Sequence, residues 1–320
     1  MPAHSSQQSP CNPGHPWFSL RSFAVKVRFI FNPVSGSNRK NPYLRGRAVD
    51  FIAHHGLDGT LVSTERPRHA TELARQAVAD GCELVVAIGG DGTMNEVASA
   101  LVGTPAIFGL IPCGSGNGLG RHLGIHQAGH GAFRTLVAGR SIAIDTGMIN
   151  GFPFFCAAGT GFEALIASRF SLLTSRGFSG YLRTGASAWW SYRPETYTIH
   201  HAKGSVTVEA FTLAVANSSQ YGNNAYIAPR ASVQDGLLDL TAVPRVNLLN
   251  AGPLLWRLFN GSIDRGGSVV HLQGETFVIE RAHPGWIHTD GEPRATTARL
   301  EITMKPHSLR IMVPAADQAG

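Results

Sequence analysis

Glu83-Leu-Val-Val-Ala-Ile-Gly-Gly-Asp-Gly-Thr-Met-Asn-Glu96 is the segment from which the fold of this chain follows. Its first half, Leu84 to Ile88, is a run of apolar and β-branched residues, which is typical of a strand buried on both faces of a parallel sheet. A glycine-rich turn follows, and Met94 to Leu101 have the spacing and composition of a helix. A strand that ends in such a turn and opens a helix predicts a phosphate site, because glycines let the backbone approach an anion and the first helical turn has free N–H groups.

Asp91 lies in the middle of this turn. A carboxylate beside phosphates is repulsive unless it faces a metal ion, a hydroxyl or a cation, so Asp91 indicates chemistry as well as binding. The glycine spacing is not that of the dinucleotide fingerprint, and no Gly-Lys-Ser/Thr follows, so neither a Rossmann dehydrogenase nor a P-loop NTPase is indicated. The alternative is a tight strand-to-helix turn whose aspartate only caps the helix.

Two similar turns follow other predicted strands. Residues 24–31 form the first predicted strand and run into Asn32-Pro-Val-Ser-Gly36, and residues 106–111 run into Pro112-Cys-Gly-Ser-Gly-Asn-Gly118. Thr64 ends the second predicted strand, residues 59–64, and is expected to lie beside the first turn. Because parallel strands end at one edge of an open sheet, where ligands bind, the turns are expected to hold a nucleotide triphosphate together. Strand–helix alternation predicts a doubly wound α/β domain.

The sequence pattern changes near residue 145. Helices are expected over residues 159–175 and 182–192, and short strands separated by turn residues then dominate, which predicts an antiparallel β-sandwich. We therefore predict a flexible leader (1–23), an α/β nucleotide-binding domain (24–145), a β-sandwich substrate domain (146–314) and a tail (315–320), with the active site in the cleft between the two domains.

Composition limits the class of protein. The chain has 320 residues, of which 43% are hydrophobic. No apolar run approaches the roughly 18 residues of a membrane span, and the leader lacks the apolar core of a signal peptide. Four scattered cysteines indicate a reducing compartment rather than a disulfide scaffold or a zinc site. The net charge of +6 favours polyanionic partners, namely nucleotide phosphates or acidic lipid surfaces. No basic run supports nucleic-acid binding.

Two acidic turns in the second half are candidates for chemistry. They are Asp235-Gly-Leu-Leu-Asp239 and Thr289-Asp-Gly-Glu292. One reading is a magnesium site and a carboxylate that accepts the proton of an attacking hydroxyl, and the other is a pair of solvated hairpin turns. His122, His126 and His130 are interpreted as structural. The apolar segments Trp189-Trp190 and Leu254–Phe259 are either core, a substrate pocket or a membrane contact.

With these residues assembled, the sequence resembles the diacylglycerol kinase catalytic-domain family of lipid kinases, which includes bacterial soluble lipid kinases and the sphingosine and ceramide kinases. The resemblance covers most of residues 24–313. The matching segments are Asn32-Pro-Val-Ser-Gly36, Gly89-Gly-Asp-Gly-Thr-Met-Asn-Glu96, Ile111-Pro-Cys-Gly-Ser-Gly-Asn117, Asp235-Gly-Leu-Leu-Asp239 and Thr289-Asp-Gly-Glu292. The GGDGT motif is shared with NAD kinases, whereas the Asn95-Glu96 continuation is more specific to lipid kinases.

The resemblance implies roles for individual residues. The expected ATP contacts are Asn32, Pro33, Val34, Ser35, Gly36, Thr64, Gly89, Gly90, Asp91, Gly92, Thr93, Met94, Asn95, Glu96, Gly114, Ser115, Gly116 and Asn117. The expected Mg²⁺ ligands are Ser232, Asp235 and Leu237, the first and last through backbone oxygens. Glu292 matches the proton acceptor of bacterial members, and Asp290 and Asp91 are the other candidates for that role.

The function implied is an ATP- and Mg²⁺-dependent kinase that phosphorylates a lipid hydroxyl, diacylglycerol- or sphingosine-like, from the cytoplasm at a membrane surface. A homodimer is one possible state. The alternatives are a kinase for a soluble substrate such as NAD, and a catalytically silent nucleotide- or lipid-binding regulator. One departure bears on the substrate: many bacterial members carry Gly-Thr-Gly-Asn-Asp, whereas this chain has Gly-Ser-Gly-Asn-Gly118 and lacks the last Asp. The Gly-Ser-Gly-Asn form is more similar to the sphingosine kinase branch, so diacylglycerol cannot be assumed as the substrate.

Overall fold

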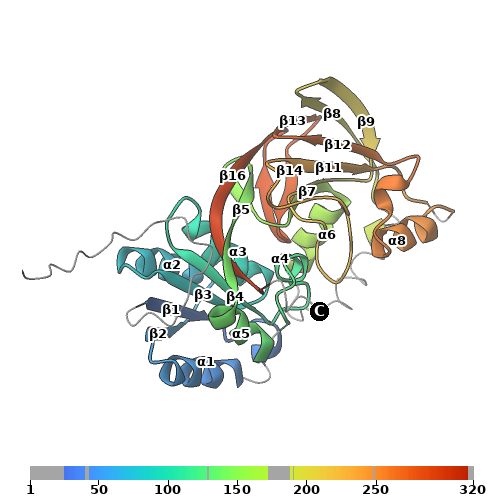
Figure 1. Ribbon diagram of the computed structural model, residues 1–320. Coiled ribbons are helices and arrows are strands. Elements are labelled where there is room, and N and C mark those ends of the chain that lie inside the picture. Colours follow the sequence, from blue (N-terminus) through green and yellow to red (C-terminus); the bar gives the residue numbers. More distant parts are fainter. Residues whose placement is uncertain are drawn as a thin grey trace, which may run out of the picture.

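The structure, a computed structural model, describes residues 25–39, 43–127, 130–171, 188–189, 191–247 and 249–315. These residues form an α/β part and a β-sandwich part that share one long strand (Figure 1). Both architectures are those predicted.

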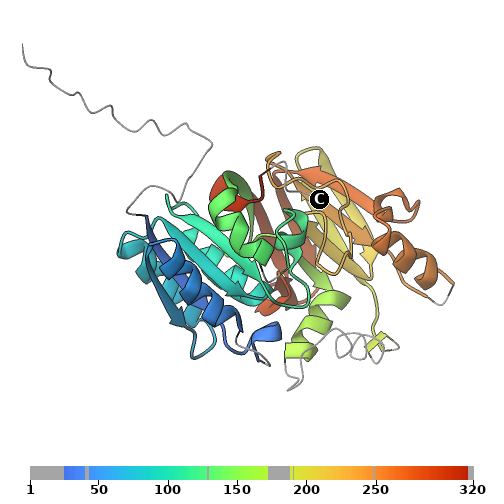
Figure 2. The same cartoon turned by 60° about the horizontal axis from the view of Figure 1, so that its bottom comes forward.

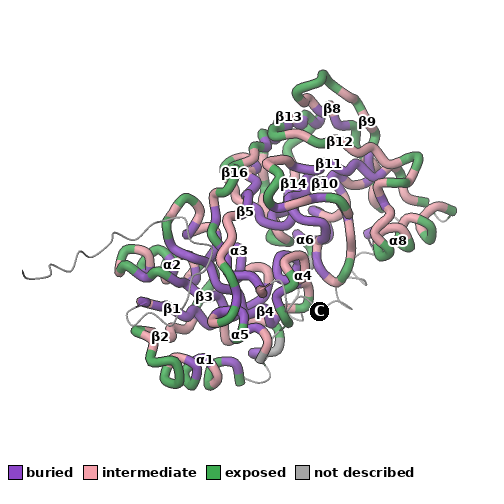
Figure 3. Tube along the Cα trace, viewed as in Figure 1, coloured by how far each residue is buried: buried purple, intermediate pink, exposed green. Residues whose placement is uncertain are grey.

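The α/β part is built on a parallel sheet. Its strand order is β2 (Asp58–Ser63), β1 (Lys26–Phe31), β3 (Leu84–Gly89) and β4 (Ile107–Pro112). The helices that cover its two faces are α2 (His69–Ala79) and α3 (Asp91–Leu101) on one face, and α1 (Tyr43–His54) and α5 (His130–Ala138) on the other. Every residue of β3 and β4 is buried, because helices cover both faces (Figure 3).

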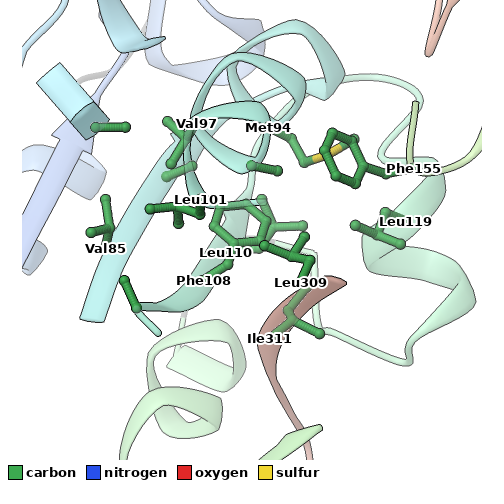
Figure 4. Close-up of a cluster of buried hydrophobic side chains, with 14 of the residues drawn as sticks. Val85, Met94, Val97, Leu101, Phe108, Leu110, Leu119, Phe155, Leu309 and Ile311 are labelled. Atoms are coloured by element: carbon green, nitrogen blue, oxygen red, sulfur yellow. The ribbon is translucent and has the colours of Figure 1, made fainter. Parts of the chain in front are cut away.

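The buried cluster on the α2–α3 face shows why these segments fold together. Val85 on β3 and Phe108 on β4 pack against Met94, Val97 and Leu101 of α3 (Figure 4). The helix α2 turns Ala70, Ala74 and Ala77 toward the same cluster, at the spacing that places residues on one helical face. This packing fixes the start of α3, and therefore the glycine-rich turn before it, at the edge of the sheet.

The second part is the predicted sandwich. One sheet contains β12 (Val270–Gly274), β11 (Leu238–Val243), β10 (Thr212–Ala216), β7 (Ala157–Gly161), β14 (Gly285–Thr289) and β15 (Glu292–Thr296), in that order. The facing strands are β16 (Arg299–Val313), β13 (Thr276–Arg281), β8 (Glu195–His201) and β9 (Gly204–Ala210), with β5 (Arg140–Ile149) and β6 (Phe152–Phe154) beside β16. Phe154, Tyr197, Phe277 and Ile302 fill the space between the sheets.

The strand β16 differs from expectation, because two strands, 298–304 and 308–313, were predicted where the structure has one of 15 residues. The segment read as a turn is a bulge between Lys305 and Leu309, with His307 at a positive φ of 48°. Beyond this bulge β16 pairs in parallel with β4. The parallel sheet and one sheet of the sandwich are therefore continuous, and the predicted domain boundary at residue 145 falls inside β5.

Other differences concern short elements. The structure contains α4 (Gly118–His122), α8 (Ala251–Phe259), β14 and β15, none of which was predicted, and α6 (Phe162–Ser171) begins three residues later than expected. The leader 1–23 and most of the predicted helix 182–192 lie outside the described residues. Cys82, Cys113 and Cys156 are buried and free. Within the described ranges no helix is both long and apolar enough to cross a bilayer.

Candidate active site

Three turns meet at the carboxyl edge of the parallel sheet, as predicted. Ser35 Oγ accepts a hydrogen bond from Gly90 N (2.7 Å), and Asn32 Nδ2 donates to Thr93 Oγ1 (2.8 Å). A Cβ on Gly114 would lie 2.7 Å from Gly90 Cα. Glycine is therefore required at position 114 because the turns pack on one another, a reason that the sequence did not reveal.

Other residues of these turns are either packed tightly against a neighbouring turn or exposed at its tip. Gly36 has a φ of 48°, and a Cβ there would lie 1.8 Å from the carbonyl oxygen of Cys113. Asn117, also at a positive φ, closes its own turn by accepting from Gly114 N (3.0 Å) and donating to Gly114 O (2.8 Å). Thr64 is buried at the end of β2 and donates its N–H to Phe31 O. Ser115 and Val34 are exposed at the tips of their turns.

Asp91 links two of the turns. Its Oδ2 accepts from Asn117 N (2.8 Å) and its Oδ1 from Gly118 N (2.9 Å), so the carboxylate caps the start of α4. A Cβ on Gly116 would lie 2.7 Å from Asp91 Oδ2. Burial raises the pKa of Asp91, and the two backbone hydrogen bonds oppose that shift. Asp91 therefore does cap a helix, as the alternative in the sequence analysis proposed, but that helix is α4 and not α3.

The turn between β14 and β15 brings two acids to the same place. The Glu292 carboxylate reaches the start of α3, since a Cβ on Gly92 would lie 2.7 Å from Glu292 Oε1. Glu292 is exposed to solvent. Negative charge is favourable at a helix N-terminus. Glu292 is thus the acid of this turn that remains free to accept a proton.

Asp290 is bound on both oxygens. It accepts from the backbone N–H groups of Phe155 (3.0 Å), Cys156 (2.7 Å) and Ala157 (3.2 Å), and from Asn95 Nδ2 (2.7 Å). Burial raises the pKa of Asp290 while these donors oppose the shift. Since Asn95 belongs to α3 and Asp290 to the sandwich, this carboxylate joins the two parts of the molecule. Its arrangement is that of a structural acid.

Glu96 binds the start of a neighbouring helix. Its carboxylate accepts from Arg68 N (3.1 Å) and Ala70 N (3.0 Å) and so caps α2. The Arg68 side chain is exposed. Burial lowers the pKa of Arg294, and the positive charge of Arg68 lowers it further. Arg294 lies over the Phe152 ring (4.5 Å) and donates to Thr289 Oγ1 (3.1 Å). Arg294 interacts electrostatically with both Glu292 and Arg68, and neither arginine was predicted as part of the site. The position of Arg294, two residues after Glu292, was the available signal.

A buried acid–histidine pair lies behind the Asp290–Glu292 turn. Glu163 Oε1 of α6 is 3.2 Å from His288 Nε2 of β14, and Gly291 N donates to His288 Nδ1 (3.4 Å). A Cβ on Gly159 would lie 1.8 Å from Glu163 Oε1, so glycine is needed there for the pair to form. The two side chains are close but not hydrogen-bonded, since Glu163 Oε1 has no hydrogen-bond partner among the described residues. The pair therefore supports the turn that carries Glu292.

The predicted magnesium ligands lie on a separate loop. Asp235 is exposed, with Oδ1 accepting from Leu237 N (3.1 Å), and Gly236 N donates to the buried Asp145 (2.8 Å). Partial desolvation of the mostly exposed carboxyl raises the pKa of Asp235, and the carboxylates of Asp239 and Asp145 raise it further. This negative potential suits a cation. In the described part of the chain, however, no cluster of three or more His, Cys, Asp or Glu side chains could hold a metal, so backbone oxygens and water would complete the shell.

The arrangement brings together the three turns, Asp91, Asn95, Asp290 and Glu292. Among the described residues, no hydrogen bond or ion pair connects Ser232, Asp235 or Leu237 to them. His122 contacts Ser219 Oγ (2.9 Å), and burial lowers its pKa, in keeping with a structural role. Gly118, the departure noted above, has no room for a side chain: a Cβ there would lie 2.8 Å from Tyr221 O.

The site fits a nucleotide polyphosphate. The N–H groups of Gly92 and Thr93 lie in the first turn of α3, where a helix leaves donors without intrahelical acceptors. The Ser115 hydroxyl is exposed beside them, and the Arg68 and Arg294 side chains add positive charge. Donors, a free carboxylate and cations at one sheet edge are the parts that phosphoryl transfer requires.

Comparison with known proteins agrees with this geometry. Residues 26–149 match the diacylglycerol kinase catalytic domain, and residues 157–313 match the YegS C-terminal NAD kinase beta sandwich-like domain. The chain belongs to the diacylglycerol kinase catalytic-domain family of lipid kinases.

Individual relatives cover most of the chain. A Synechocystis protein described as uncharacterized is 30% identical over 89% of this chain and 69% of its own length. A Klebsiella pneumoniae protein described as "Probable lipid kinase YegS-like" is 29% identical over 88% of this chain and 94% of its own length. A solved structure of a diacylglycerol kinase from Bacillus anthracis has the same fold, with a TM-score of 0.69 at 19% identity, and covers 91% of this chain and 98% of its own.

Proposed function

We propose that the protein transfers the γ-phosphoryl group of ATP to a lipid hydroxyl, with Mg²⁺, on the cytoplasmic surface of a membrane. The observation that carries this proposal is the Glu292 carboxylate, which is exposed and reaches the N-terminal turn of α3 beside the glycine turns. That turn offers N–H groups to phosphate, so a proton acceptor and a phosphate site lie together.

Each residue of the site has a part in this reaction. The N–H groups of Gly92 and Thr93 and the Ser115 hydroxyl would bind phosphate oxygens, and Arg68 and Arg294 would offset their charge. Glu292 would accept the proton of the attacking hydroxyl. Asp91 would hold the second glycine turn in register by capping α4. The Ser232–Leu237 loop would hold Mg²⁺, which when bound supplies charge neutralisation.

A lipid acceptor is supported by a cavity of about 500 Å³ at the start of β14. Its walls include Leu165 of α6, Tyr192 and Trp286, which suit an acyl or alkyl chain. The strand β14 runs from this cavity toward Glu292, and five residues of strand span roughly 14–17 Å. An extended lipid chain can cover that length and leave its hydroxyl beside the carboxylate. The cavity wall also contains Arg193, Glu195 and Arg281, so a polar acceptor such as NAD is the second candidate.

The test is transfer of labelled γ-phosphate from Mg-ATP to diacylglycerol, sphingosine, ceramide and NAD, with and without EDTA. We expect a labelled lipid and loss of transfer with EDTA. Glu292→Gln should lower kcat by roughly 10²–10⁴-fold without changing the free energy of unfolding, because the side chain is exposed. Glu209→Gln, an exposed position on β9, is the matched control.

Label on NAD alone would replace the lipid by a soluble substrate. ATP binding with no transfer to any acceptor would favour the silent regulator. A Glu292→Gln variant with wild-type kcat would remove Glu292 as the proton acceptor.

A further inference from the structure

The helix α8 is unusual because the side chains that it turns toward solvent are apolar. Leu255 is 55% exposed, Trp256 68% and Phe259 46%, and the preceding Leu249 is 90% exposed. These four are half of the eight exposed large apolar side chains in the described part of the chain. In Figures 1 and 2, α8 lies at the end of the sandwich remote from α1 and α2.

Helical spacing explains the pattern. Gly252, Leu255, Trp256 and Phe259 stand at i, i+3, i+4 and i+7, so they share one face. The opposite face carries Leu254 and Leu258, which pack against the buried cluster around Ala214, Ile227 and Val243. A helix of an isolated globular domain would place charged residues on its outer face; here that face has none.

The charged residues around α8 are almost all basic. Arg257 lies on the helix, and Arg245 and Arg265 flank it. No Asp or Glu occurs between Asp239 and Asp264, and Asp264 is neutralised by Arg230 at 2.9 Å. An apolar face that contains a tryptophan and is bordered by arginines matches the interface of an anionic bilayer, where indole rings lie at headgroup depth and arginines meet lipid phosphates.

A second copy of the chain fits this face less well. A stable protein interface uses roughly 20–30 residues a side. The exposed apolar face of α8 offers four large side chains from residues 249–259. A bilayer needs no matching surface, so a small apolar wedge with a basic border is sufficient for it.

The surface is connected to the active site. Tyr226 N donates to Leu258 O (2.8 Å), which ties α8 to the loop of residues 221–226. That loop packs on the second glycine turn, where Asn223 N donates to Gly116 O and Gly222 forms a bridge with Asn117. A bilayer bound at α8 would therefore hold the ATP-binding turns in a fixed orientation to its surface.

We propose that α8, with Leu249 and its bordering arginines, is the surface by which this protein docks on anionic membranes. This docking surface rests on the proposed function in one respect: a kinase that acts on a lipid must reach the bilayer that contains it. The binding itself is independent of catalysis.

The first experiment is co-sedimentation with vesicles of 70% phosphatidylcholine and 30% phosphatidylglycerol. The triple variant Leu255→Ser, Trp256→Ser, Phe259→Ser should bind at least about tenfold more weakly than the wild type, because it loses most of the inserted apolar area. Leu254 and Leu258 remain, so the melting temperature should not fall. Val49→Ser, at an exposed apolar position on α1, is the matched control and should bind as the wild type does.

The second experiment tests the charges. Arg245→Gln and Arg265→Gln should each weaken binding to the anionic vesicles roughly fivefold. Binding to vesicles of phosphatidylcholine alone should not depend on these arginines. Equal losses on both kinds of vesicle would remove the electrostatic part of the proposal.

Two further outcomes separate this proposal from the proposed function. Vesicle binding unchanged in the triple variant would overturn the docking surface, and a simultaneous change from dimer to monomer in light scattering would assign the face to a second copy. Activity on a water-soluble short-chain diacylglycerol, assayed without vesicles, tests the kinase alone and should be equal in the wild type and the triple variant. Failure of that activity, with α8-dependent vesicle binding intact, would overturn the function and leave the docking surface standing.

Discussion

Asp290 and Glu292 are two residues apart, yet their surroundings differ. Asp290 accepts hydrogen bonds from four donors, three of them backbone N–H groups, whereas Glu292 is exposed. An Asn at position 290 would turn an NH₂ group toward N–H donors and leave them without an acceptor. Asp290→Asn should therefore lower the free energy of unfolding by about 1–3 kcal/mol or more, measured by urea denaturation. Wild-type stability in this variant, with kcat reduced, would instead make Asp290 a catalytic group.

Asp91 provides a prediction about pH. Since burial raises its pKa, the carboxyl binds its proton more tightly in the folded chain than in the unfolded chain. Its contribution to stability is then greatest at and below the ordinary Asp pKa of about 4, and it declines as the pH rises through the raised folded value. Urea denaturation of the wild type and Asp91→Asn should be measured between pH 4 and 7. As the pH rises, the unfolding free energy of the wild type should fall relative to that of the variant. A difference that moves the opposite way would mean that the two backbone hydrogen bonds outweigh burial.

The sequence located the residues of the site better than it located their roles. Asn32, Gly90 and Asp91 were expected together because strand ends meet at one sheet edge, whereas Glu292 was expected there from the family resemblance. The structure places all four beside the start of α3. The capping of α2 by Glu96 and the clamp on Asp290 were not predictable, since each depends on backbone N–H groups brought close by tertiary packing. No sequence spacing encodes those partners.

At the scale of elements, α6 and β14 are coupled by the Glu163–His288 pair. His288→Asn keeps an acceptor at the Nδ1 position for Gly291 N, whereas His288→Gln places its amide at the Nε2 position and loses that contact. We expect the Gln variant to lower kcat by roughly 10- to 100-fold with KM unchanged, and the Asn variant to lower it less. The measurement is the separate determination of kcat and KM, with Glu163→Gln as the companion variant. Equal losses in both His288 variants would mean that the pair only fills space.

Short elements escaped the sequence analysis for physical reasons. The helix α4 has five residues and two glycines, so its propensity is low, and it forms because Asp91 caps it. The helix α8 contains Pro253 near its start and exposes apolar side chains, so its pattern resembled core. A hairpin turn at Asp290-Gly291 was one of the two readings of that segment, but the strands β14 and β15 on either side were not predicted. For the two helices, contacts from elsewhere in the chain outweighed local preference.

At the scale of the whole molecule, β16 makes the two parts interdependent. It pairs with β13 and β5 in the sandwich and with β4 in the parallel sheet, and its residues Leu309 and Ile311 are fully buried in the α/β core. Calorimetry should therefore show one cooperative unfolding transition rather than two. Ile311→Ala should lower the melting temperature of that single transition, because it removes about 2–5 kcal/mol of core packing. Two resolved transitions, with only the first moved by Ile311→Ala, would show that the parts unfold independently.

The position of β16 also affects how the protein folds during synthesis. The ribosome completes β1 to β4 early, but the strand that covers the free edge of β4 is made only after the whole sandwich, roughly 10–40 s later at ordinary elongation rates. Until then the edge of β4 has no partner strand, and the buried cluster around Phe108 lacks Leu309 and Ile311, which is the condition under which nascent chains recruit chaperones. Ribosome-stalled chains that end near residue 150 should thus be protease-sensitive, and resistance should appear only after β16 has left the exit tunnel.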